Sequence, residues 1–272
     1  MNLTSPTQVK AWCIENGFHP NKVLGQNFLI DRNALEAIVD AGLEGGGGAR
    51  RVLEIGPGLG VLTEELLRRG CTVTAIEKDP VLAGRLAGSL GCPANLTVLE
   101  GDALMYIDRA AEFGIDFSSF PFMVSNLPYQ AGTRILLELV KRREIAMMTV
   151  LVQTEVAERL AAGPGSKTRS LAGVWAQLDY DVKIVRKVAA SCFWPRPEIG
   201  STVVRLVRHN RNMGLSCKER SVFHSLTKRA FEHRRKQLGS IFKDMIQSTA
   251  RAEELSNEDW IFLTKGVNDA DT

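Results

Sequence analysis

Short runs of apolar residues alternate with helical patterns along the first two hundred positions of the chain. Such alternation is typical of parallel strands joined by crossover helices, so the sequence predicts a doubly wound α/β sheet of seven strands. The expected strands are 51–55, 72–77, 96–100, 122–125, 147–153, 182–188 and 202–207, and the expected helices include 62–69, 80–90 and 133–142.

The pattern changes to helices alone after residue 208. Between 222 and 245 apolar residues recur at helical spacing, but Arg234 falls on the apolar side of one continuous helix. We therefore expect a break near His233 and two shorter helices. The glycines 45–48 predict a flexible link before the first of these strands. The expected domains are a large α/β domain over 1–207 and a small all-helical domain over 208–272.

Charge is unevenly distributed between these two regions. The net charge of the chain is +3, yet the segment 205–243 carries eleven Lys or Arg against two acids and therefore a net +9. A concentration of cations at one end is typical of a domain that docks on phosphates, because that attraction acts whatever the nucleic-acid sequence. The alternative is a helical face that is merely solvated.

The remaining composition indicates an ordinary soluble protein. Five cysteines are scattered without a close pair, which favours neither a metal site nor a disulfide framework. We find no apolar stretch long enough to span a membrane and no signal or transit segment, so we expect a cytoplasmic protein with no membrane partner. We also expect that it needs no metal and that it is a monomer.

The segment Glu54 to Gly60 (EIGPGLG) stands between a predicted strand and a predicted helix. Glycines there let a ligand approach the backbone and the first amides of the helix. A dinucleotide fingerprint would place a small residue where Val61 stands, whereas Gly-x-Gly-x-Gly after an acid suits S-adenosylmethionine. The alternative interpretation is a plain tight turn.

Two acids follow the next strands, at the edge of an open sheet where ligands bind. Glu77 closes the second strand and could accept both ribose hydroxyls of the cofactor. Asp102 follows the third strand and could accept a hydrogen bond from the cofactor's adenine amine. An acid at a strand end can also be only a helix cap, but together with Gly56 and Gly58 the two acids predict a cofactor site.

Asn126-Leu127-Pro128-Tyr129 follows the fourth strand, beside the expected cofactor. The exocyclic amine of adenine is a poor nucleophile, because its lone pair is delocalised into the ring. The side-chain oxygen of Asn126 and the carbonyl of Leu127, held rigid by Pro128, could accept the two amine hydrogens. Tyr129 could stack on the base, and Phe193 in a proline-rich segment could cover its other face. Taken alone, Phe193 is more typical of a core residue.

With these motifs, the chain resembles a known family along nearly its whole length, the KsgA/RsmA ribosomal RNA small-subunit (16S) adenine N6,N6-dimethyltransferases. Further motifs that carry the resemblance are Gly25 to Leu29 (GQNFL), Gln153 with Glu155-Val156, Gly163-Pro164 with Ser166-Lys167, Phe193-x-Pro195-x-Pro197 with Ser201, and Arg234-Arg235-Lys236.

The resemblance implies a Rossmann-like class I methyltransferase fold with a small helical C-terminal domain. It implies dimethylation of two adjacent adenines in the 3′-terminal hairpin of 16S rRNA, in the immature small subunit. The implied cofactor residues are Gln26, Asn27, Leu29, Gly56, Gly58, Glu77, Asp102 and Asn126, and the implied RNA-binding residues are Lys228, Arg229, Arg234, Arg235 and Lys236.

The chain departs from the family pattern at three places. Gln130-Ala131-Gly132 replaces Asn-Ile-Ser, Arg169-Ser170 replaces an aromatic-glycine pair, and Glu198 replaces a commonly basic residue. We expect these positions at the RNA-facing rim.

Three alternatives remain open. A large-subunit methyltransferase of the erythromycin-resistance type usually carries Ile in place of Leu127, and a DNA adenine methyltransferase would show Asp-Pro-Pro-Tyr. A non-catalytic assembly or RNA-binding factor could keep the fold without the chemistry.

Overall fold

The computed structural model describes residues 1–21, 23–45, 50–209, 211 and 214–270. Contacts divide the chain into two compact units, of which the first comprises Met1–Ala157 and Lys183–Arg208. The second comprises Glu158–Val182 and the described residues from His209 onward. The predicted boundary near 208 assigns 158–182 to the larger domain, whereas the contacts group this segment with the C-terminal helices. The predicted division into a catalytic and an RNA-binding domain stays a prediction, and the predicted link over 45–48 lies outside the described residues except for Gly45.

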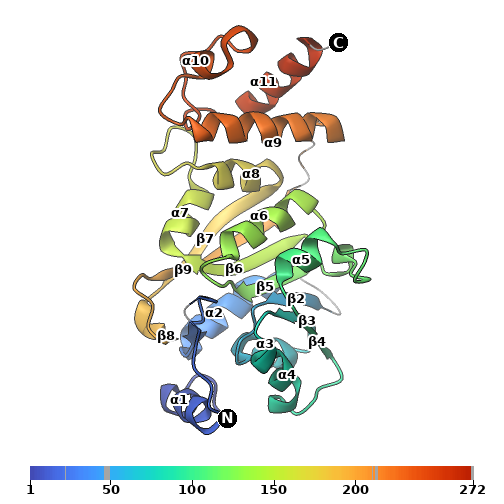
Figure 1. The fold of residues 1–272 in the computed structure, drawn as a ribbon, viewed down its shortest axis with the longest axis vertical. Coiled ribbons are helices and arrows are strands. Elements are labelled where there is room, and N and C mark those ends of the chain that lie inside the picture. Colours follow the sequence, from blue (N-terminus) through green and yellow to red (C-terminus); the bar gives the residue numbers. More distant parts are fainter. Residues whose placement is uncertain (22, 46–49, 210, 212–213, 271–272) are drawn as a thin grey trace. The chain divides into compact units, whose positions relative to one another are not determined.

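The central sheet has the strand order β4-β3-β2-β5-β6-β9-β7, which makes seven strands within the described part of the chain (Figure 1). Strands β2 to β6 are paired in parallel, and β9 runs antiparallel to β6. The strands are β2 (Arg51–Ile55), β3 (Thr72–Glu77), β4 (Leu96–Glu100), β5 (Phe122–Asn126), β6 (Met147–Gln153), β7 (Tyr180–Val188) and β9 (Ser201–Arg208). The predicted seven-stranded, mostly parallel α/β fold is confirmed.

The strand at the β9 side of the sheet, β7, differs from the others in its exposure. Residues 183–187 are all exposed, including Ile184 and Val185, whereas β6 is buried from Met147 to Val152. An edge strand has a neighbouring strand on one side only, and charged side chains are one feature that discourages a second chain from pairing with it. Lys183, Arg186 and Lys187 place positive charge along this edge.

Within the described residues, six α-helices begin and end in the first unit, and a seventh, α7 (Thr154–Ala161), runs from it into the segment of the second unit that starts at Glu158. The six are α1 (Pro6–Glu15), α2 (Arg32–Leu43), α3 (Val61–Arg68), α4 (Pro80–Ser89), α5 (Ala103–Asp108) and α6 (Gly132–Arg142). Helix α2 packs against β5 and β6, α3 against β3 and β5, and α4 against β3 and β4. The three predicted helices agree with α3, α4 and α6 to within one residue at each end. The N-terminal pair α1 and α2 was not among the predicted helices.

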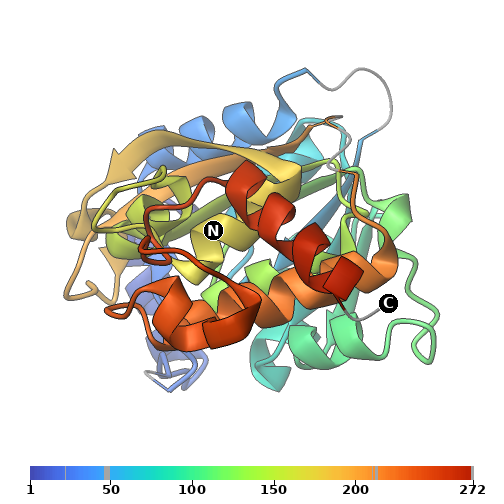
Figure 2. The ribbon, with the colours of Figure 1, turned by 90° about the horizontal axis from the view of Figure 1, so that it is seen from above.

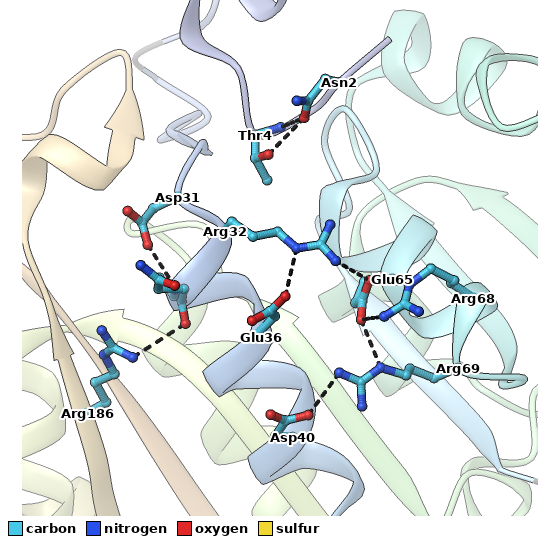
Figure 3. A network of polar contacts seen from close by, with 12 residues as sticks. Asn2, Thr4, Asp31, Arg32, Glu36, Asp40, Glu65, Arg68, Arg69 and Arg186 are labelled. Carbon is cyan, nitrogen blue, oxygen red and sulfur yellow. Dashed lines mark hydrogen bonds and ion pairs between the residues drawn. The ribbon is translucent and has the colours of Figure 1, made fainter.

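A network of ion pairs joins α2 to α3 around the buried carboxylate of Glu65 (Figure 3). Arg68 and Arg69 donate to Glu65 through their Nε atoms at 2.8 Å each, and Arg32 lies 3.6 Å from it. Arg69 also reaches Asp40 at 3.0 Å. The hydrogen bond from Arg68 is the largest of the causes that lower the pKa of Glu65 to about 2. The carboxylate therefore stays ionised in spite of its burial.

A two-stranded antiparallel sheet of β1 (Phe28–Leu29) and β8 (Phe193–Trp194) joins the N-terminal segment to the segment before β9. Leu29 pairs with Phe193, and both side chains are buried in the same apolar cluster. The short 3-10 turns η1 (Phe117–Ser119), η2 (Ala190–Cys192) and η3 (Lys243–Met245) complete the connections.

The second unit contains α8 (Leu171–Asp179), α9 (Cys217–Glu232), α10 (Leu238–Phe242) and α11 (Asn257–Ala270), and Figure 2 shows the last three close together. Helices α8 and α11 both pack against α9, and the indole nitrogen of Trp175 donates to Thr227 at 2.9 Å. Helix α9 ends at Glu232 with His233 as its C-cap, so the predicted break is confirmed. None of the helices in the described residues combines the length and the apolar character that crossing a membrane requires.

Candidate active site

A cavity of about 220 Å³ lies in the first unit, at the carboxyl ends of β2, β3 and β5. Every predicted cofactor residue lines it: Gln26, Asn27, Leu29, Gly56, Gly58, Glu77, Asp102 and Asn126. Leu127, Pro128 and Tyr129 line it as well. Phe193 is not part of the lining. The cavity therefore joins the predicted cofactor residues to four of the five catalytic candidates, Asn126 to Tyr129 at the end of β5.

The loop between β2 and α3 forms one wall of this cavity and depends on glycine. Gly58 has φ +59, and a Cβ atom there would lie 3.1 Å from the ring of Phe28. Its amide donates to Oε2 of Glu77 at 2.9 Å. Gly60, with φ +92, begins α3 as its N-cap. The left-handed backbone and the close packing exclude a side chain at these glycines. This wall of the cavity is therefore bare backbone that a ligand can approach.

Two buried carboxyls meet beneath this loop. Glu77 accepts the amides of Gly58 and Asp79, and burial raises the pKa of Glu77. Glu54 is 1% exposed and accepts the hydroxyl of Thr63 at 2.7 Å. Burial raises the pKa of Glu54 to about 8, against the smaller lowering by Thr63, and the nearby charge of Glu77 adds to the rise. Glu54 is therefore predominantly protonated at neutral pH.

Asp102 is the third acid of the cavity, and it begins α5 by accepting the amide of Leu104 at 2.9 Å. Lys78, which also lines the cavity, donates to Oδ2 of Asp102 at 2.8 Å. This hydrogen bond lowers the pKa of Asp102. Asp102 is thus an ionised acceptor, as its predicted contact with an adenine amine requires.

Asn126 holds its amide in one orientation at the end of β5. Its Nδ2 donates to the carbonyl of Asn27 at 3.2 Å. Its Oδ1 is buried and accepts no hydrogen bond from any described residue. A buried acceptor without a partner is costly, so the orphaned oxygen indicates a donor that arrives with a ligand.

The backbone after Asn126 offers a second acceptor. The carbonyl of Pro128 accepts the amides of Ala131 at 3.2 Å and Gly132 at 2.7 Å, whereas that of Leu127 accepts no hydrogen bond within the described part of the chain. Gly132 is also required sterically, because a Cβ atom there would lie 2.9 Å from Cβ of Leu127. The usual serine at this position could be accommodated only if Leu127 shifted.

The two aromatic candidates occupy different environments. Tyr129 lines the cavity, and its hydroxyl is hydrogen-bonded to Ser201, while burial raises its pKa. Phe193 is 2% exposed and lies in the apolar cluster behind Leu29. Its role as the second stacking ring stays a prediction.

The N-terminal segment lines the cavity and approaches Tyr129 closely. A Cβ atom at Gly25, which has φ +66, would lie 3.2 Å from the amide nitrogen of Tyr129. Gln26 donates to Asp79 at 2.9 Å, and Asn27 donates to the carbonyl of Gly25 at 3.1 Å. Gln26 thus fastens this segment to the start of α4, a structural role beyond the predicted cofactor contact.

The arrangement of glycines, acids and free acceptors fits a nucleoside-type cofactor beside an amine substrate, and comparison with known proteins gives it a family. The model of the family described as "Ribosomal RNA adenine dimethylase" matches residues 17–265. The chain belongs to the ribosomal RNA adenine dimethylase family. It is therefore an enzyme that uses S-adenosylmethionine as its methyl donor.

Individual relatives agree with this assignment. The chain is 43% identical to a protein of Deinococcus radiodurans named ribosomal RNA small subunit methyltransferase A, over 75% of the chain and 67% of the relative. A dimethyladenosine transferase from Plasmodium falciparum has the same fold, with a TM-score of 0.72, 23% identity, and coverage of 89% and 97%. The 23S rRNA methyltransferase ErmE also shares it, with a TM-score of 0.63, 23% identity, and coverage of 89% and 100%. The fold of a dimethylase alone therefore does not distinguish between these activities.

The basic candidates of the second unit divide into two groups. Lys228, Arg235 and Lys236 are exposed, Arg229 is exposed but contacts its own unit, and Arg234 is half-buried. Arg229 lies over the ring of Phe242 at 5.3 Å, and Arg234 donates to the carbonyl of Lys167 at 2.6 Å and reaches Glu253 at 3.4 Å. Arg229 and Arg234 therefore make contacts that stabilise the second unit, whether or not they also bind RNA.

Arg169, one of the departures from the family pattern, is buried and does not lie at a surface rim. Arg169 was expected at the RNA-facing rim, but it is 1% exposed. Its guanidinium donates to the carbonyl of Ala162 at 3.0 Å, to Gln177 at 3.3 Å and to Asn257 at 3.1 Å. The expectation is wrong because these acceptors of the second unit enclose the side chain.

Two residues at the site were not predicted as functional. Lys78 follows Glu77, the acid at the end of β3, directly in the sequence. This position next to a predicted cofactor residue could have identified Lys78 as a residue of the site. Ser201 belongs to a family motif, but its contact with Tyr129 links positions 72 residues apart, for which the local pattern gives no signal.

Proposed function

We propose that the chain transfers methyl groups to the N6 amines of two adjacent adenines in the 3′-terminal hairpin of 16S rRNA, giving N6,N6-dimethyladenosine. We further propose that the substrate is the immature small ribosomal subunit, and that the enzyme acts on it as a monomer in the cytoplasm. The 43% identity to a named small-subunit methyltransferase supports this target over the large subunit.

The observation that carries the proposed chemistry is the free Oδ1 of Asn126. An adenine amine has two hydrogens, and the described site presents two acceptors without partners, Oδ1 of Asn126 and the carbonyl of Leu127. Accepting both hydrogens draws the nitrogen towards a pyramidal geometry and localises its lone pair. The acceptors are held in advance, so no reorganisation is needed when charge develops on the nitrogen.

The other side chains bind and orient the reactants. Bound S-adenosylmethionine would supply the methyl group on a positively charged sulfur. Glu77 and Asp102 would hold the cofactor's ribose and adenine, and the amides of the glycine loop would face its remainder. Tyr129 would stack on a target base that has left its own helix, because a stacked and paired amine cannot reach the cavity. A general base is not needed, since the proton can pass to water from a cationic product.

The experiment that tests the proposal is methyl transfer to purified subunits. Labelled S-adenosylmethionine is offered to small subunits that lack the modification and, separately, to large subunits, and the labelled nucleotides are mapped. We expect dimethyladenosine at two adjacent positions of the small-subunit hairpin. Label confined to the large subunit would instead identify a resistance-type activity, and the absence of label from both would favour a binding factor.

The exposed cations of the second unit support a proposal about RNA docking. We expect Arg235→Ala with Lys236→Ala to weaken binding to small subunits and to reduce the slope of log Kd against log salt by roughly 1 to 2, because each lost phosphate contact removes about one counterion from the release. Binding across a salt series measures this. Lys141→Ala is the control, since that cation is paired with Glu138 at 2.9 Å. An unchanged slope in the double variant would mean that the cations are only solvated.

A further inference from the structure

The ring of Tyr129 is held at its hydroxyl end as well as at its backbone. The hydroxyl forms a hydrogen bond of 2.5 Å with Oγ of Ser201. At the other end, the backbone amide of Tyr129 packs closely on Gly25. A tyrosine ring has two side-chain torsions, and a fixed hydroxyl together with a fixed Cα leaves little freedom in either.

Ser201 is a rigid point of attachment. It is fully buried and is the first residue of β9, where it pairs with Gln153 across the antiparallel ladder. The preceding carbonyl, that of Gly200, accepts both the amide and the hydroxyl of Thr154, at 3.1 and 3.0 Å. Within the described residues, the hydroxyl of Ser201 forms its hydrogen bond with Tyr129. The sheet therefore fixes the position of the ring's hydroxyl through Ser201.

We propose that Ser201 is a positioning residue for methyl transfer, which fixes the plane of the Tyr129 ring so that a flipped adenine stacks with its amine at the two acceptors. This inference rests on the proposed function, because it assigns the base to the face of Tyr129. The hydrogen bond is needed for orientation, and the ring alone supplies the stacking surface. An unheld ring would still bind the base, but with its amine away from Asn126 in most encounters.

The test compares Ser201→Ala, Tyr129→Phe and the double variant in methyl transfer to unmodified small subunits. Each single variant removes the same hydrogen bond and keeps the aromatic ring. We expect each to lower kcat roughly tenfold, within the range that base stacking contributes, with the Kd of S-adenosylmethionine and the KM for subunits within about twofold. The double variant should lose no more than either single one, because both act on one contact.

Thr202→Ala is the matched control, since this neighbouring residue of β9 is equally buried and its hydroxyl meets Thr154 at 3.0 Å instead of Tyr129. It should leave kcat unchanged even if it lowers the melting temperature as much as Ser201→Ala does. Losses in kcat that add in the double variant, a fully active Tyr129→Phe, or an equal loss in Thr202→Ala would each overturn the proposal. A wild-type enzyme inactive on small subunits would refute the proposed function instead.

Discussion

Replacing Asn126 with alanine should lower kcat for methyl transfer about 100- to 1000-fold, while the Kd of S-adenosylmethionine stays within about tenfold. Loss of one preorganised hydrogen-bond partner of the reacting atoms typically has this magnitude. The Oδ1 atom has no protein partner to lose. The variant also removes the Nδ2 donor to the carbonyl of Asn27, so its effect includes the loss of that hydrogen bond. Single-turnover transfer measures the first quantity, and calorimetric titration with the cofactor measures the second.

Asn126→Asp separates the acceptor from the donor of the same side chain. Aspartate keeps an oxygen that can accept the amine hydrogen but loses the donor that holds the group to the carbonyl of Asn27. We expect its kcat to lie between those of the alanine variant and the wild type. Full turnover in Asn126→Ala would show that this oxygen takes no part in the reaction.

Replacing Glu54 with glutamine should make the protein more resistant to urea at pH 8, by roughly 4 kcal/mol relative to its effect at pH 4.5. In the folded state the pKa of Glu54 is about 8, whereas its ordinary value is 4.5. Between these pH values the unfolded chain releases a proton that the folded chain retains, so the free energy of unfolding falls as pH rises, by about 1.4 kcal/mol per pH unit. Glutamine stays neutral and can still accept the hydroxyl of Thr63.

Glu65→Gln, within α3, provides the opposite control. The pKa of Glu65 is lowered to about 2, so its carboxylate stabilises the fold above pH 4.5 and loses that contribution as pH falls towards 2. The glutamine variant should therefore be destabilised at neutral pH and lack the acid-side decline. Urea unfolding at a series of pH values distinguishes the two windows. A parallel pH dependence of wild type and Glu54→Gln would contradict a protonated Glu54.

The elements that could be predicted from the sequence are those whose burial leaves a local pattern. β6 is buried from Met147 to Val152, and its mostly apolar run, interrupted by Thr149 alone, predicted the strand bounds correctly. Arg234 revealed the end of α9, because a continuous helix would have placed it on the apolar side. By contrast, α1 buries only Val9 and Cys13, which is too few apolar positions for a helical pattern to stand out.

The site was predictable to the extent that parallel strands bring their carboxyl ends to one edge. This rule predicts from the sequence that Glu77, Asp102 and Asn126 lie at one edge, and all three line the same cavity. Contacts between distant segments leave no such trace. The burial of Arg169 depends on Asn257, which is 88 residues away, and the bond between Tyr129 and Ser201 depends on how β9 enters the sheet.

The charged edge of β7 also bears on how copies of this protein meet in solution. Two molecules that joined their sheets through β7 would bring Lys183, Arg186 and Lys187 of one against the same cations of the other. Such pairing is electrostatically unfavourable at low ionic strength, although the exposed Ile184 and Val185 would otherwise favour it. Dissolved salt screens this repulsion over about 10 Å at 0.1 M. These charges therefore protect the protein against edge-to-edge association through β7, and the protection weakens as the salt concentration rises.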